Sequence, residues 1–336
     1  MTAAEKPFFR FSTVTLTCSC GTWLPWLLLA VELVRNRARC AWLLVTLAIA
    51  GLFALQILAG HTQTTFITAV ALLIWILAGR LGSRFLPGLK TANESTEDDN
   101  LVRPVTALII GGLLAIALAA IQILPTLELT NYSSRAGGLP ANEVMSFSLP
   151  PHLLASALLP AYGQSLFTEY VAYMPLIILA LAFVGGWQWR NRAGVFPALA
   201  VTVSGLFLAL GAYNPVYWLL ARLPGFNLFR APARWLVLYA LGLSLLAGIG
   251  WHLLWQWAGS SDGAQERRSI LRSKIAPPLL LFFAAVLLLA LWGFAAGSLV
   301  EFVPLGPEAP DPRPLPTAVG GWILELLLLV VLVAAA

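Results

Sequence analysis

The sequence predicts an all-α membrane protein, a polytopic bundle of about nine transmembrane helices. Two observations lead to this fold class. The chain of 336 residues is 59% hydrophobic and only 10% charged, with a mean hydropathy of +0.83, which leaves too little polar surface for a soluble protein of this size. Runs of about 20 apolar residues also recur, the length that a helix needs to cross a bilayer. Lipid offers the backbone no hydrogen-bond partners, so such runs form helices rather than open sheets.

The apolar runs define the predicted spans. Prolines stand at the start of two of them, a position that tolerates proline because the first backbone N–H groups of a helix have no partner within it. We expect one transmembrane domain over residues 1–336, with a cytoplasmic linker at 80–103 and an outer segment at 125–170 that suits a re-entrant hairpin. The predicted spans lie near 14–34, 40–59, 65–79, 104–124, 171–189, 194–211, 235–257, 277–298 and 319–336.

The basic residues of four predicted loops give the orientation. When the spans alternate, all four loops fall on the same side of the membrane. Lys and Arg accumulate in short cytoplasmic loops, so this side is predicted to be cytoplasmic. The residues are Arg35, Arg37 and Arg39; Arg80, Arg84, Lys90 and Arg103; Arg190 and Arg192; and Arg267, Arg268, Arg272 and Lys274.

The loop at 212–234 departs from this pattern, because Arg222, Arg230 and Arg234 then lie on the outer side. An arginine offers a planar fork of donors that matches phosphate, and a lipid phosphate lies at the level expected for this loop. The alternative is that these side chains only reach toward lipid headgroups from the helix ends. Three residues would shape the loop backbone and so position the arginines: Pro224, Gly225 and Pro232.

Other polar side chains gather in the predicted outer segments. His61 and Gln63 stand at the end of the second span, and Glu128 and Arg135 follow the fourth. His61 has a structural alternative, a hydrogen-bonded helix end.

The composition and motifs exclude several function classes. The net charge of +5 and pI near 9.4 come from arginines clustered in short loops, so no nucleic-acid partner is expected. The three cysteines have no spacing typical of a metal site, and no cofactor is evident. No hydrolase triad, zinc-protease, phosphate-loop or dinucleotide motif occurs in its required context, so no catalytic residue is assigned.

Several stretches resemble the YfhO-like bacterial membrane proteins. The most specific is 223–250, with the pattern Pro-Gly-aromatic…Phe-Arg-Ala-Pro-x-Arg. The stretch at 59–63 is similar to their Ala-Gly-His-Pro-Gln, with Thr62 in place of the proline, and 122–138, 146–160 and 169–181 resemble their outer segment and following span. The resemblance covers roughly residues 20–250.

Those proteins are related to the GT-C glycosyltransferases, which take sugars from polyprenyl-phosphate carriers on the outer membrane face. The resemblance implies a GT-C-like fold, the bacterial cytoplasmic membrane, and a polyprenyl-phosphate sugar and membrane lipid as partners; it names no protein partner. Arg230 and Arg234 would bind the carrier phosphate, with His61 and Gln63 near the same cavity and Glu128 and Arg135 at its mouth.

The sequence departs from GT-C enzymes in lacking their acidic residue in the first outer loop, which acts as a base or metal-site residue. We therefore expect a fragment without the catalytic loop; the complete enzyme would have room for a divalent metal. Two other functions stay open. A transporter or lipid flippase would need polar groups at the membrane midplane, and a non-catalytic scaffold would use the arginines only to hold headgroups.

Overall fold

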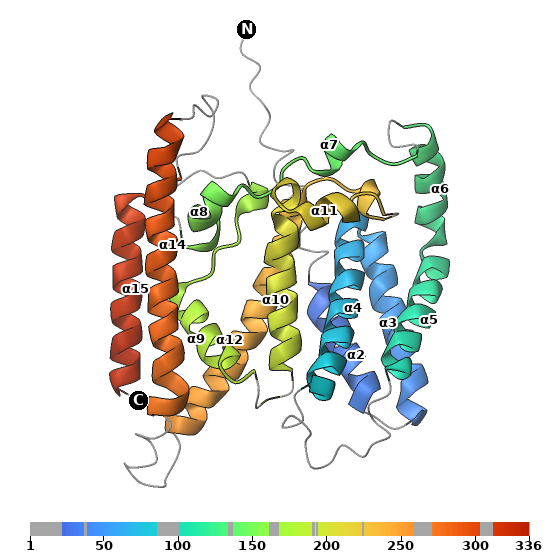
Figure 1. Cartoon of the computed structure of the whole chain (residues 1–336). Coiled ribbons are helices and arrows are strands. Elements are labelled where there is room, and N and C mark those ends of the chain that lie inside the picture. The colour runs from blue at the N-terminus through green and yellow to red at the C-terminus, as the bar shows by residue number, and fades with distance from the viewer. Residues whose placement is uncertain are drawn as a thin grey trace. The chain divides into compact units, whose positions relative to one another are not determined.

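The computed structural model describes residues 22–36, 39–85, 101–133, 137–160, 168–189, 192, 194–223, 225–258, 271–302 and 312–335. All regular secondary structure in these residues is helical, which confirms the predicted all-α class for this part of the chain (Figure 1). The chain forms two compact units: unit 1 comprises residues 1–140 with 227–229, and unit 2 comprises 141–226 with 230–336. The single transmembrane domain stays a prediction.

Membrane-spanning character is clear for some of the predicted spans. Three helical segments are long and apolar enough to cross a bilayer, Thr62–Arg84, Pro232–Ala258 and Ser273–Leu299. A fourth candidate is the pair Val102–Leu118 and Ala120–Asn131, which is bent by 79° at its break. Four further apolar helices are shorter: Trp42–Leu58, Leu176–Gly186, Val195–Ala209 and Pro316–Val331. That all nine predicted segments cross the membrane stays a prediction.

Unit 1 is a cluster of helices in which α3 packs against α2 and α5. Small residues allow the close approach: a Cβ on Gly111 of α5 would overlap the Ile49 side chain and press on the Thr46 carbonyl oxygen of α3. The predicted fourth span is not straight, because α5 ends at Leu118 and α6 starts in a new direction. The helices are α2 (Trp23–Asn36), α3 (Arg39–Leu58), α4 (Thr62–Phe85), α5 (Val102–Leu118) and α6 (Ala120–Asn131).

Unit 2 contains the remaining described helices. Long helices alternate with short ones, and most of the short helices lie between α7 and the start of α12. The long helices are α9 (Leu176–Gly186), α10 (Val195–Ala209), α12 (Leu236–Ala258), α14 (Ala276–Phe302) and α15 (Pro316–Ala335). The short ones are α7 (Ala141–Val144), η2 (Pro151–Leu153), α8 (Leu154–Leu158), η3 (Thr168–Tyr170), η4 (Gly211–Tyr213), α11 (Pro215–Leu220), η5 (Phe226–Leu228, shared with unit 1), η6 (Pro232–Trp235) and η7 (Leu271–Ile275).

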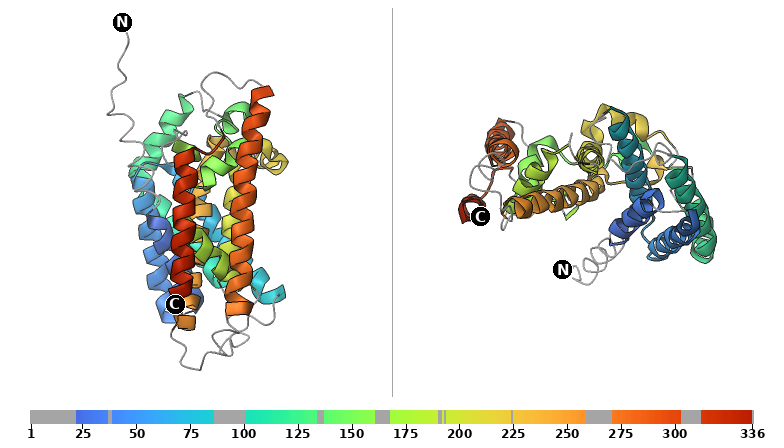
Figure 2. Two further views of the ribbon diagram at one scale, coloured as in Figure 1. Left: turned by 90° about the vertical axis from the view of Figure 1, so that its left-hand side faces the viewer. Right: turned by 90° about the horizontal axis from the view of Figure 1, so that it is seen from below.

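Helix α12 is the centre of unit 2 and runs beside α9 and α10 (Figure 2). Glycines make this packing possible. A Cβ on Gly250 of α12 would overlap the Leu181 carbonyl of α9, and one on Gly242 would overlap Thr202 of α10. Lipid tails are as apolar as leucine, so membrane helices gain from such close backbone contact rather than from burying apolar surface.

The middle of the predicted outer segment packs within unit 2. Ala155, Ala157 and Leu159 are buried, and indole N–H groups hold the neighbouring backbone. Trp292 Nε1 of α14 donates to the Pro151 carbonyl at 2.8 Å, and Trp322 Nε1 of α15 donates to the Pro160 carbonyl at 2.6 Å. Helix α8 is therefore covered by protein, which is the condition that a re-entrant segment would need.

Candidate functional site

The segment 222–235, here the arginine loop, has a strained backbone held by hydrogen bonds. Ala231 has φ 63° and Phe147 has φ 57°, the two described non-glycine residues in the left-handed region. The two sites are adjacent: the Ala231 N–H donates to the Ser146 carbonyl at 3.1 Å, and the Ala233 N–H donates to the Phe147 carbonyl at 3.3 Å. Left-handed alanine and phenylalanine persist only where surrounding contacts impose them, and such residues cluster at functional sites.

The segment that holds the arginine loop is itself fixed to the end of α10. The Ser148 hydroxyl donates to the Met145 carbonyl at 2.6 Å and accepts from the Ala212 N–H at 2.8 Å. The Leu149 N–H donates to the Ala209 carbonyl at 2.9 Å. Gly211 leaves room for this contact, because a Cβ there would overlap the Ser148 hydroxyl.

Aromatic rings pack along the arginine loop. Phe226 stacks on Trp235 with ring centroids 5.7 Å apart, and Tyr217 meets Phe226 edge-on at 6.3 Å. Trp235 and Tyr217 are buried, so the rings anchor the loop in unit 2 at Phe226 and at Trp235. Hydrogen bonds and rings together fix the backbone from which the arginines project.

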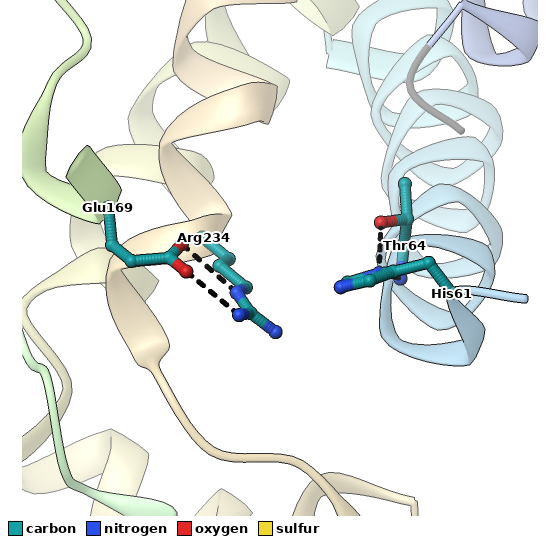
Figure 3. A network of polar contacts seen from close by, with 4 residues as sticks. All are labelled: His61, Thr64, Glu169 and Arg234. Atoms are coloured by element: carbon teal, nitrogen blue, oxygen red, sulfur yellow. Dashed lines mark hydrogen bonds and ion pairs between the residues drawn. The ribbon is translucent and has the colours of Figure 1, made fainter. Parts of the chain in front are cut away.

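Arg234 forms a bidentate ion pair with Glu169 (Figure 3). Nε donates to Oε2 at 3.0 Å and Nη2 donates to Oε1 at 2.8 Å, which is the side-on fork that arginine offers to oxyanions. The side chains of Arg234 and Glu169 keep 25% and 23% of their exposure, so the pair is partly shielded from water but within reach of it. Arg234 is therefore oriented as an oxyanion donor, with a carboxylate as its partner.

The other two predicted phosphate ligands, Arg222 and Arg230, are exposed. Arg230 directly precedes the strained Ala231, so the backbone conformation of the loop sets the direction in which its side chain leaves. Beside Glu169, burial raises the pKa of the Tyr170 hydroxyl above its ordinary value, and nearby Tyr213 raises it further.

His61 caps the N-terminus of α4 in unit 1 (Figure 3). Nδ1 accepts from the Thr64 N–H at 3.3 Å and lies 2.7 Å from the Thr64 hydroxyl. An acceptor Nδ1 places the ring proton on Nε2. These contacts match the alternative interpretation of His61, in which its side chain accepts hydrogen bonds at a helix N-terminus. Gln63, two residues on, is buried in unit 1.

Two predicted site residues remain, Glu128 and Arg135. Glu128 is exposed on α6, a helix in which none of the described residues is buried. Arg135 lies outside the described residues. The structure therefore describes Arg230 and Arg234 within unit 2 and His61, Gln63 and Glu128 within unit 1.

Glu169 and Glu325 make structural contacts but are not among the site residues predicted from the sequence. Glu169 is an acidic residue in the predicted outer segment 125–170, which has almost no basic residues, a signal that it pairs with a distant arginine. Glu325 lies within the apolar helix α15, and its Oε2 accepts from the Leu176 N–H, the first amide of α9, at 2.5 Å. It acts as a helix cap supplied by another helix.

The described residues contain no cluster of metal-ligating side chains. Among these residues, no group of three or more His, Cys, Asp or Glu side chains is placed to hold an ion. The chemistry visible in unit 2 is that of an arginine side chain that binds a carboxylate in a bidentate contact, on a loop held by backbone hydrogen bonds. No protein-family model, curated protein or solved structure matches this chain.

Proposed function

We propose that this chain is a YfhO-like, GT-C-related protein of the bacterial cytoplasmic membrane, with nine spans, that binds a polyprenyl-phosphate-linked sugar on its outer face for glycosylation of the cell envelope. In this proposal Arg230 and Arg234 bind the carrier phosphate, with Arg222 contributing positive charge nearby. The membrane-spanning helices and the resemblance of the arginine loop to the family pattern support it.

One observation carries the phosphate role. Arg234 binds the Glu169 carboxylate through Nε and Nη2. The loop that carries Arg234 is held in a strained conformation by hydrogen bonds to Ser146 and Phe147. A guanidinium that only snorkels to headgroups needs neither a fixed backbone nor a fixed fork. Preorganised donors of this kind stabilise charge that develops on a leaving group.

The transfer chemistry assigns a clear role to the arginines. The acceptor oxygen would bond to the anomeric carbon of the sugar, while the bond between that carbon and the phosphate oxygen breaks. The electron pair stays on the phosphate, which gains one negative charge, and the acceptor proton passes to a carboxylate base. The arginines oppose the charge gain on the leaving phosphate; the base is not assigned to any residue of this chain.

Binding of a polyprenyl phosphate by the purified chain tests the proposal. Native mass spectrometry would compare the wild type with the Arg230→Ala/Arg234→Ala double variant, and with Arg192→Ala as a control for removing an arginine of unit 2 outside the arginine loop. We expect retention by the wild type and the control and at least a tenfold loss in the double variant, about 1.4 kcal/mol or more. Equal binding by wild type and double variant would end the phosphate role.

Arginine-to-lysine variants separate the proposal from a scaffold. A bidentate site discriminates between the two residues, so Arg234→Lys should weaken binding, whereas a headgroup anchor would tolerate lysine. A transporter would instead show uptake driven by an ion gradient. The nine-span topology predicts that single cysteines at 213 and 170 react with an impermeant thiol reagent from outside, and one at 192 only after permeabilisation.

A further inference from the structure

We infer that Glu169 is a specificity-determining residue of the phosphate site: its carboxylate competes with the bound anion for Arg234 and so sets how tightly the site holds that anion. The inference rests on the proposed phosphate role of the arginine loop. It is carried by the geometry of one ion pair within unit 2.

The competition follows from shared donors. Glu169 takes Nε and Nη2 of Arg234, an edge through which a guanidinium can also bind phosphate in a bidentate contact. A phosphate that uses this edge must displace the carboxylate, and a phosphate on any other edge of the same guanidinium still lies close to it. In both cases the negative charge of Glu169 opposes binding, and partial burial of the pair limits screening by water.

The opposition depends on the charge of the ligand. A carrier-linked sugar is a phosphodiester with one negative charge, whereas the carrier left after transfer is a monoester whose second ionisation has a pKa near 6. Coulomb repulsion scales with the product of charges, so Glu169 disfavours the doubly charged monoester more strongly than the diester. Glu169 thereby promotes release of the spent carrier, which two arginines alone would retain.

The test measures the affinity of the full-length purified chain for two probes, farnesyl phosphate and its methyl diester, at pH 7.5. The variants are Glu169→Gln, which keeps the shape of the side chain and removes its charge, and Glu143→Gln, a matched control at another glutamate of unit 2 outside the ion pair. We expect Glu169→Gln to tighten binding of the monoester about fivefold and that of the diester about twofold. Glu143→Gln should leave both affinities unchanged.

A second comparison shows whether Glu169 acts through Arg234. In an Arg234→Gln background the competition for the guanidinium is gone and only the direct repulsion between Glu169 and the phosphate remains, so adding Glu169→Gln should tighten monoester binding by clearly less than the roughly fivefold expected with Arg234 in place. This cycle separates the competition from a general loss of folding, because misfolding would lower binding in every Glu169→Gln protein.

Each contrary result has its own meaning. Weaker binding in Glu169→Gln would show that the carboxylate positions Arg234 for the anion, which overturns the competition, as would unchanged affinities. Those results leave the phosphate site standing when the wild type binds the monoester through Arg230 and Arg234. Absence of binding in both the wild type and Glu169→Gln would overturn the proposed phosphate role and the inference together.

Discussion

The amide of Ala231 donates a hydrogen bond to the carbonyl oxygen of Ser146 at 3.1 Å, and the residues on either side of this contact carry the strain of the arginine loop. Ala231 itself and Phe147, next to Ser146, both have left-handed backbone conformations. The two segments hold each other in conformations that neither would keep alone. The direction of Arg230 and Arg234 thus depends on a backbone contact more than 80 residues apart in sequence.

Substitution of Ala231 should reveal this constraint. A β-branched residue is strongly disfavoured at φ 63° and Ala231 is 2% exposed, so Ala231→Val should lower the free energy of unfolding by about 2 kcal/mol or more. Ala231→Gly should be tolerated, because glycine adopts this conformation without strain. Thermal unfolding in detergent, followed by circular dichroism, measures both, with Ala117→Val on the exposed face of α5 as the control. Equal stability of the two valine variants would contradict the constraint.

The glycine contacts of α12 allow a comparison within one helix. Gly250→Ala should destabilise unit 2 by about 1–3 kcal/mol, because the added methyl group would overlap the backbone of Leu181, which cannot rotate away. Gly248→Ala is the control, since nothing lies within 4 Å of its Cβ position. Alanine also favours helix over glycine there, so this variant should match or exceed the wild type in a denaturation titration. Equal effects at 248 and 250 would rule out close packing of α12 on α9.

Removal of the Glu325 charge from the apolar helix α15 should lower the free energy of unfolding, the opposite of what its location suggests. Lipid disfavours a carboxylate, so a change to leucine would ordinarily stabilise the helix in a membrane. Here Glu325→Leu leaves the buried Leu176 amide without its acceptor and should cost about 1–3 kcal/mol. Glu325→Gln keeps an acceptor oxygen and should cost less. A leucine variant more stable than the wild type in unfolding experiments would contradict the capping role.

His61 should behave as a helix cap. His61→Ala removes the acceptor for the Thr64 amide and should lower stability by about 1 kcal/mol, whereas His61→Asn supplies another good cap and should restore most of it. The same two variants separate capping from ligand binding when polyprenyl-phosphate affinity is also measured. Asparagine that restores stability without restoring affinity would assign His61 a direct role at the ligand.

Several features were predictable from the sequence because they depend on nearby residues. Apolar runs have the length and composition of helices whatever packs around them, and each predicted span overlaps a helix in the described residues. The predicted start of the fifth span at 171 is wrong, because residues 171–175 are not helical and α9 begins at Leu176. The helix-end alternative for His61 matches its contacts because a cap involves residues three positions apart. The arginine loop was visible as a local exception to the charge pattern between apolar segments.

Tertiary structure decided what hydropathy and local spacing do not encode. Arg234 meets Glu169 across 65 positions and Glu325 meets Leu176 across 149, pairings that exist only once particular helices pack together. The 79° bend at Ala119 lies in a run that reads as one span, since hydropathy measures length and not direction. The sequence alone determined that the chain is helical, rich in membrane-length segments and carries an arginine loop. Only folding gave Arg234 its carboxylate partner, because a chain's local composition sets which segments enter lipid while packing geometry sets which charges meet.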